Sequence, residues 1–215
     1  MNSHQESPRL DARRPFHIIR AHARAYLVLN ALAYGLFAIG FVVGLLFPHL
    51  NQAEVERLND DGTVDLVQSL INNPWLFALT ILGVNTLRMG AVTIVLPSMI
   101  VPFAGIPLFG YWTLTTGITL VPASDIGWVA LIPHSLTLVV EFQAYILLTL
   151  GVYVLGRCWI WPQTVGVDNR RAGYVRGLRQ LGWLSLPAAV LLVIGAVYEA
   201  FSLRYFVHPL AQWLL

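Results

Sequence analysis

Five apolar runs of membrane-spanning length limit this chain to one class of fold. They occupy residues 27–47, 75–96, 103–120, 128–155 and 181–201, and each holds at most one charged residue. A transmembrane helix needs about 20 predominantly apolar residues. The sequence therefore predicts an all-α fold, a polytopic bundle of about five transmembrane helices.

Composition supports this prediction over the whole chain. Of 215 residues only 11% are charged and 57% are hydrophobic, and the mean hydropathy is +0.67. Soluble domains average roughly 25% charged residues. These values argue against a disordered chain, a nucleic-acid-binding domain and a soluble metabolic enzyme. We interpret residues 1–215 as a single integral membrane domain.

Two regions need a more specific interpretation. The first run follows an Arg-rich segment, residues 1–26, and it is too long for a signal-peptide core. Phe16, Ile18 and Ile19 predict an interfacial helix just before it. Residues 97–116 are apolar but interrupted by three prolines. They predict a break near the membrane face, followed by the third span, and the alternative is a partly re-entrant segment that makes a sixth span.

The arginines predict the orientation. The 13 basic residues are all Arg, and ten of them lie in the N-terminal segment, residues 1–26, and in a predicted polar loop, residues 156–180. Five crossings place both segments on one side of the membrane and the acidic loop, residues 48–74, on the other. The positive-inside rule makes the Arg-rich side cytoplasmic. We therefore expect a multi-pass protein of the cytoplasmic (inner) membrane with a cytoplasmic N-terminus.

The acidic outer loop is the most hydrophilic internal segment. Its pattern predicts short amphipathic helices around an Asp61-Gly62 turn. It offers the most accessible surface for a protein partner, with the acidic residues Glu54, Glu56, Asp60 and Asp61.

Two opposite charges fall within predicted spans. Arg88 lies in the second span and Glu141 in the fourth. An intramembrane charge costs at least about 2.5 kcal/mol on insertion scales, so it should be paired or hydrated. The simpler interpretation is a structural Arg88–Glu141 ion pair that fixes helix register. The alternative is a polar pathway or an active site.

Three further polar residues extend this pattern. His134 is seven residues before Glu141, on the same helix face. Asn85 is three residues before Arg88, also on one face, and Glu199 lies near the end of the fifth span. We call the predicted set the polar seam: Asn85, Arg88, His134, Glu141 and Glu199.

The sequence contains no set of residues typical of an enzyme. His134 and Glu141 are too far apart to share one metal without a third element, and the His-Glu-x-x-His pattern is absent. A single cysteine, Cys158, excludes an internal disulfide and a cysteine-based zinc cluster. We predict no catalytic residues, no metal and no cofactor.

Several short motifs resemble the stage II sporulation protein M family of integral membrane proteins. They are Asn72-Asn73-Pro74, the stretch Gly83–Gly90, Leu131-Ile-Pro-His134, Glu141-Phe-Gln-Ala144 and Val197-Tyr-Glu199-Ala-Phe201. The resemblance covers nearly the whole chain. Where the family has Asn-Gly after the second span, this chain has Phe103-Ala-Gly105, and Ser135 replaces the Gly of its Pro-His-Gly motif.

The resemblance implies a non-enzymatic membrane scaffold. In sporulating bacteria the family member gathers peptidoglycan-degrading enzymes during engulfment. For this chain the resemblance implies a bundle that can form a homodimer and recruits other membrane or envelope proteins. Two alternatives stay open: a permease-like transporter subunit with a polar intramembrane cavity, and an intramembrane metal-dependent hydrolase that uses His134 and Glu141.

Overall fold

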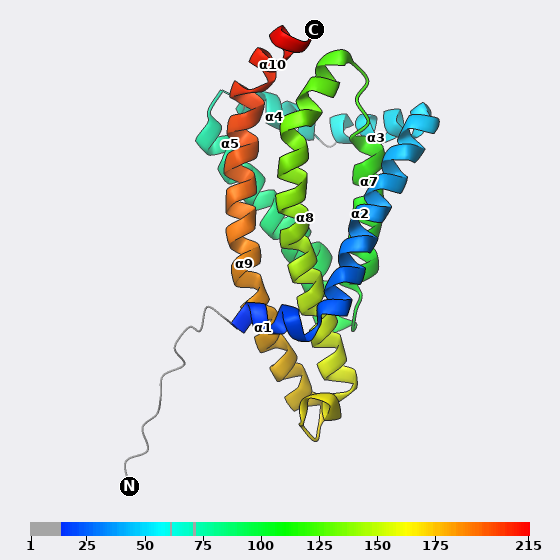
Figure 1. Cartoon of the computed structure of the whole chain (residues 1–215), viewed down its shortest axis with the longest axis vertical. Helices are drawn as coiled ribbons and strands as arrows, with labels where there is room; N and C mark the ends of the chain where they lie inside the picture. Colours follow the sequence, from blue (N-terminus) through cyan, green and yellow to red (C-terminus); the bar gives the residue numbers. More distant parts are fainter. Residues whose placement is uncertain (1–13, 61, 71) are drawn as a thin grey trace.

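The computed structural model describes residues 14–60, 62–70 and 72–215, and within these ranges the chain forms helices and no strand (Figure 1). In chain order the elements are α1 (Arg14–Ala21), α2 (Ala23–Leu46), α3 (Pro48–Asp60), α4 (Thr63–Leu70), α5 (Pro74–Gly83), η1 (Val84–Val95), α6 (Leu96–Ile100), α7 (Gly105–Thr119), α8 (Asp125–Ile160), η2 (Pro162–Val165), α9 (Arg170–Tyr205) and α10 (Val207–Leu214). The predicted all-α class is confirmed.

Four helices are long and apolar enough to cross a membrane. They are α2, the continuous run α5–η1–α6, α8 and α9. The predicted third span corresponds to α7, which has only 15 residues and is therefore about 22 Å long. Helix α7 nevertheless contacts other helices at both of its ends. Gly105 packs on Ile94 and Ser98, and Ile118 contacts α3. The protein is thus a helical membrane protein with four full spans and one short fifth helix.

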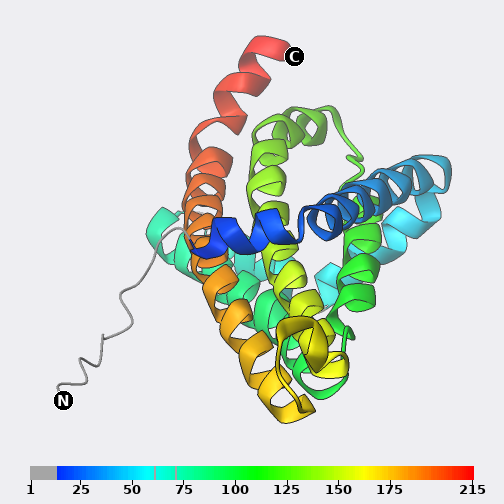
Figure 2. The same ribbon diagram turned by 60° about the horizontal axis from the view of Figure 1, so that its bottom comes forward.

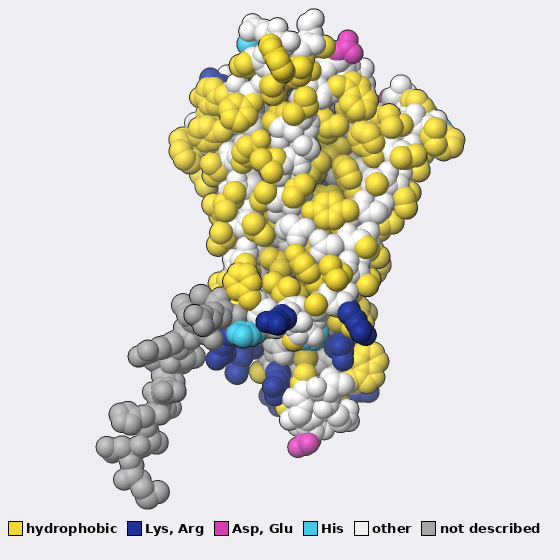
Figure 3. Space-filling view, in the orientation of Figure 1, with side chains coloured by type: hydrophobic (Ala, Val, Ile, Leu, Met, Phe, Trp, Pro, Cys, Tyr) yellow, Lys and Arg dark blue, Asp and Glu magenta, His cyan; other side chains and the backbone are white. Residues whose placement is uncertain are grey.

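The helices alternate in direction, so the two Arg-rich segments meet at one end. In Figure 1, α2, α7 and α9 run upward, whereas α5–α6 and α8 run downward. Helix α1 and the turn between α8 and α9 therefore lie toward the lower end, and α3, α4 and α10 lie at the upper end. Figure 3 shows an apolar surface above a cluster of basic side chains. We call the lower end the arginine-rich end.

The predicted interfacial helix is present as α1. It crosses the bundle almost at right angles to the long helices (Figures 1 and 2). Ile18 and Ile19 pack on the core, whereas Phe16 is 72% exposed. This amphipathic arrangement is that of a helix lying in the plane of a membrane surface.

Helix α8 forms the centre of the bundle. Its most apolar 18-residue window is 78% buried, compared with 17–33% for the other three candidate spans. Phe142 and Tyr145 of α8 pack against Phe109 of α7 at the middle of the core. Residues placed on α8 can therefore contact several neighbouring helices.

The predicted Arg-rich loop, residues 156–180, is mostly helical, so that prediction is wrong in its local structure. Helix α8 continues to Ile160 and α9 begins at Arg170. Asn169 caps α9, because its Oδ1 accepts from the backbone N–H of Ala172 at 2.8 Å. The two helices extend beyond the level of α1 as a packed hairpin (Figure 1). Close packing at Gly173 and Gly177 allows this extension.

The predicted break after the second span is confirmed. Val101 is extended and Phe103 has a φ of +68°, which turns the chain directly into α7. The backbone N–H of Gly105 donates to the Ser98 hydroxyl at 2.8 Å across this turn. The described ranges contain no sixth crossing here.

Candidate functional site

Four of the five polar seam residues come together between three helices. Helix α8 contributes His134 and Glu141, α9 contributes Glu199, and η1 contributes Asn85. Asn85 Nδ2 donates to Glu141 Oε1 at 2.5 Å. His134 Nδ1 lies 3.4 Å from Glu199 Oε1. The seven-residue spacing of His134 and Glu141 thus places both on the face of α8 that meets polar partners.

The fifth residue, Arg88, lies outside this group, so the expected Arg88–Glu141 ion pair is wrong. Glu141 is buried and bonded to Asn85, whereas Arg88 is on the exposed surface of η1. In the described part of the chain, no Arg forms an ion pair with Glu141 or Glu199. The four seam residues that come together therefore include two carboxyl groups and no arginine.

The π-helical geometry of η1 explains this separation. In an α-helix, residues three apart share a face, which is why Asn85 and Arg88 were expected together. A π-helix has about 4.4 residues per turn, because its hydrogen bonds close one residue later. Met89 and Gly90 consequently share the inward face with Asn85 and are buried, and Arg88 is turned outward.

The seam lies in the half of the bundle away from the arginine-rich end. Along α9, Trp183 and Arg204 are 21 residues apart, or about 32 Å, which matches the thickness of a bilayer core. Glu199 is five residues from Arg204, or about 8 Å along the helix. Glu141 packs against Gly195, about 14 Å from Arg204. Both carboxyl groups are therefore at intramembrane depth.

Two cavities meet at Glu199. The first, of about 310 Å³, is lined by His134 and Glu199 together with the α7–α8 connection around Pro122. The second, of about 200 Å³, is lined by Asn85, Glu141 and Glu199 together with α4 and α5. Glu199 is therefore shared by the two cavities.

Burial makes ionisation of His134, Glu141 and Glu199 energetically unfavourable. The side chains of His134 and Glu199 are 21% and 16% exposed, and Glu141 is 7% exposed. If both carboxyl groups were ionised, a protonated His134 would balance only one of them. An uncompensated buried charge is strongly unfavourable. A proton bound at Glu141 or Glu199 would therefore lower the cost of burying these carboxyl groups.

Sequence reasoning missed two buried hydroxyl groups on the same face of α8. Thr137 and Tyr145 are each four residues from Glu141, and their hydroxyl oxygens have no hydrogen-bond partner in the described part of the chain. The four-residue spacing of Thr137, Glu141 and Tyr145 was the available signal. These hydroxyls extend the polar stripe of α8 on both sides of Glu141.

A second polar cluster, also missed, joins α2 to α8. Gln143 accepts a hydrogen bond from the Tyr26 hydroxyl at 2.6 Å. Its Nε2 donates to Asn30 Oδ1 at 2.8 Å and to the Tyr34 hydroxyl at 3.0 Å. Tyr26, Asn30 and Tyr34 recur every four residues, a pattern that predicts one polar helix face. All the donors and acceptors named here are mutually satisfied, which indicates a structural role.

The remaining predicted features are placed as follows. Helices α3 and α4 form the expected pair around Gly62, whose φ is +76°. On α3, Glu56 and Asp60 are exposed and Glu54 pairs with Arg57 at 3.0 Å, while Asp61 lies outside the described residues. Cys158 is buried at the α8–α9 hairpin.

A metal centre finds no support in this geometry. Across the described ranges, no three His, Cys, Asp or Glu side chains are grouped so that they could hold a metal ion. The described residues therefore supply no third ligand beside His134 and Glu141 for the hydrolase alternative.

Comparison with models of protein families, with curated proteins and with solved structures finds no match.

Proposed function

We propose that the protein is a permease-like subunit of the cytoplasmic membrane that takes up a proton at the polar seam. One observation carries this proposal: the buried Glu141 and the partly buried Glu199 line one cavity, and within the described residues neither carboxyl group pairs with an arginine. Ionisable residues inside a membrane protein usually serve ion or proton pathways. The arginine-rich end is assigned to the cytoplasm by the positive-inside rule, so the seam faces the outer half of the membrane.

The two cavities support a route for the proton. A proton entering beside the α7–α8 connection reaches His134 and Glu199 first. Glu199 then shares the second cavity with Glu141, whose carboxyl group accepts from Asn85. His134 can orient the proton, because its Nδ1 lies 3.4 Å from Glu199 Oε1.

Proton flux into sealed vesicles tests this proposal. The purified protein is reconstituted in vesicles that contain a pH-sensitive dye, and an acid pulse is applied outside. Flux should exceed that of protein-free vesicles and should fall at least about tenfold in Glu141→Gln and Glu199→Gln, which keep size and hydrogen bonding. Asp125→Asn, which removes an exposed carboxylate from the first turn of α8, is the matched control. Equal flux in all variants would contradict the proposal.

Arg88 favours a second role, assembly with another membrane protein, in line with a scaffold. The residue is exposed on η1, about 20 Å along the span from Pro74, between the exposed apolar side chains Leu87 and Val92. A guanidinium at that depth is stabilised when a neighbouring helix supplies a carboxylate. A two-fold homodimer through this face would bring two arginines together, so we propose a different membrane or envelope protein as the partner.

Photo-crosslinking in native membranes tests the assembly role. A photoreactive residue at position 92 should give a discrete product larger than the monomer. The product should disappear in Arg88→Leu. It should persist in Arg24→Gln, which removes an exposed arginine at the start of α2. An unchanged product in Arg88→Leu would contradict a charge-dependent contact.

A further inference from the structure

A cavity lies at the arginine-rich end, away from the half of the bundle that holds the polar seam. It measures about 780 Å³ and is formed between helix α1 and the first four turns of α9. Its cationic side chains are Arg14, Arg171, Arg176 and Arg179, with His17 beside them. Among the described residues, no Asp or Glu lines it. We call it the basic pocket.

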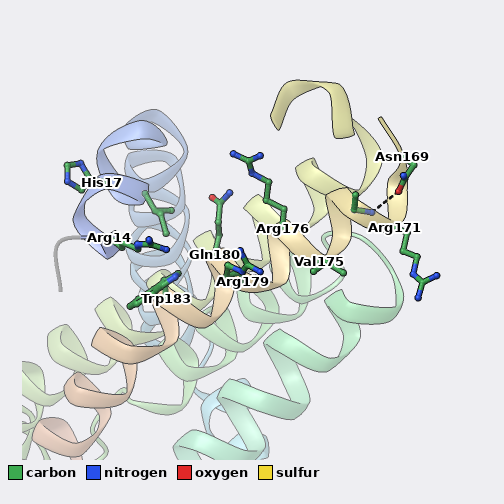
Figure 4. Close-up of a pocket in the computed structure, with 11 residues that line it drawn as sticks. Arg14, His17, Asn169, Arg171, Val175, Arg176, Arg179, Gln180 and Trp183 are labelled. Atoms are coloured by element: carbon green, nitrogen blue, oxygen red, sulfur yellow. Dashed lines mark hydrogen bonds between the residues drawn. The ribbon is translucent and has the colours of Figure 1, made fainter. Parts of the chain in front are cut away.

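The arginines of the basic pocket form no ion pair with the described residues of the chain. Arg14 instead stacks on the Trp183 ring, with its guanidinium carbon 5.2 Å from the ring centroid. Figure 4 shows Arg14 and His17 on one wall and Arg176 and Arg179 on the other. Four cations gathered without an anion favour an external anionic ligand.

The rest of the lining combines the polar side chains of Asn169 and Gln180 with apolar side chains. Ile18, Val175 and Trp183 complete the walls. Trp183 is an aromatic residue of the type enriched at membrane–water interfaces, and α1 lies in the plane of that interface. A soluble anion would contact only the arginine side chains. A phospholipid would use both parts, with its phosphate on the arginines and its glycerol and upper acyl chains along Ile18 and Trp183.

We propose that the basic pocket binds the headgroup of an anionic phospholipid. Its phosphate accepts hydrogen bonds from Arg176 and Arg179 of α9, while Arg14 closes the pocket from α1. Bound lipid therefore joins the amphipathic helix to the end of the bundle core. Basic pockets between helices on the cytoplasmic side are the usual location for such headgroups.

Native mass spectrometry of the intact protein in neutral detergent tests the proposal. The probes are cardiolipin and phosphatidylglycerol, with phosphatidylcholine as the neutral comparison and inorganic phosphate as the soluble anion. Both anionic lipids should bind at least about tenfold more tightly than phosphatidylcholine, and added salt should weaken binding. Equal binding of phosphatidylcholine would overturn the proposal. Full displacement by inorganic phosphate would also overturn it, because it would indicate a soluble-anion site.

Paired variants separate this pocket from general surface charge. Arg176→Gln with Arg179→Gln should weaken anionic lipid binding by at least about tenfold. Arg20→Gln with Arg24→Gln removes the same charge from exposed residues at the same end that do not line the pocket, and it should change binding less than about twofold. Equal loss in both double variants would overturn the proposal. All four positions are exposed, so an unchanged melting temperature is expected and verifies folding.

Discussion

Asn85 donates a hydrogen bond of 2.5 Å to Glu141 between η1 and α8. This contact stands where an arginine–glutamate ion pair was expected, and it leaves the intramembrane carboxyl group without a fixed cation. The consequence is a site whose charge depends on what it binds. The stability of the bundle should reflect the same contact.

Replacement of Asn85 should therefore destabilise the protein more than replacement of Arg88. Asn85→Leu leaves a buried carboxyl group without its donor, which costs about 1–3 kcal/mol of unfolding free energy. Arg88→Leu removes an exposed intramembrane charge and should leave stability unchanged or raised in the isolated protein. Thermal unfolding in mild detergent compares the two variants. A larger loss in Arg88→Leu would indicate that the ion pair exists.

Asn51 should be a major contact between α3 and the bundle. Its buried side chain reaches the carbonyl oxygens of Ile118, Thr119 and Val121 at 2.9–3.2 Å, at the C-terminus of α7. Terminal carbonyls of a helix lack intrahelical partners. Asn51→Leu should cost about 1–3 kcal/mol, whereas Gln52→Leu at the exposed neighbour should cost much less. The melting temperatures of the two variants distinguish these outcomes.

Close packing of α2 on α7 should depend on Gly40. A Cβ at Gly40 would collide with the backbone carbonyl of Leu114, and Gly117 faces α2 in the same way. Gly40→Ala should therefore lower stability by about 1–3 kcal/mol. Gly35, on the same helix, has open space around it, so Gly35→Ala should be neutral or stabilising. Equal effects of the two variants on thermal unfolding would contradict this packing.

The Gln143 cluster should act as structural support without affecting proton uptake. Gln143→Leu removes hydrogen bonds to Tyr26, Asn30 and Tyr34. Interhelical hydrogen bonds in membranes average about 0.6 kcal/mol each, so a loss of about 1–2 kcal/mol is expected. Proton flux per folded protein should stay at the wild-type level. A selective loss of flux with unchanged stability would place this cluster in the pathway.

The sequence was sufficient to predict an all-α bundle with long apolar helices and an amphipathic helix before the first of them. Each follows from local composition and length, which lipid constrains strongly. The partner of Arg88 could not be predicted in this way. The direction of the Arg88 side chain depends on η1 being a π-helix. The sequence prediction assumed an α-helix with 3.6 residues per turn. Residues 156–180 were wrongly predicted to form a loop, because their composition is polar. In the structure most of them belong to the ends of α8 and α9, which pack against each other.

His134, Glu141 and Glu199 illustrate the part of the site that was predictable. Their burial follows from their places in apolar spans, and the seven-residue spacing on α8 correctly put two of them on one face. The pairing of His134 with Glu199 required the antiparallel register of α8 and α9, which no local pattern contains. The basic pocket likewise depends on α1 folding back over α9.

The most direct test of the central claim is infrared difference spectroscopy of the carboxyl C=O band during a pH change, on the protein in lipid. The account predicts a band from a protonated, buried carboxyl group near neutral pH, which is removed in Glu141→Gln or Glu199→Gln and kept in Asp125→Asn. A wild-type spectrum without such a band at any pH between 5 and 8, in which both glutamates stay ionised, would contradict it.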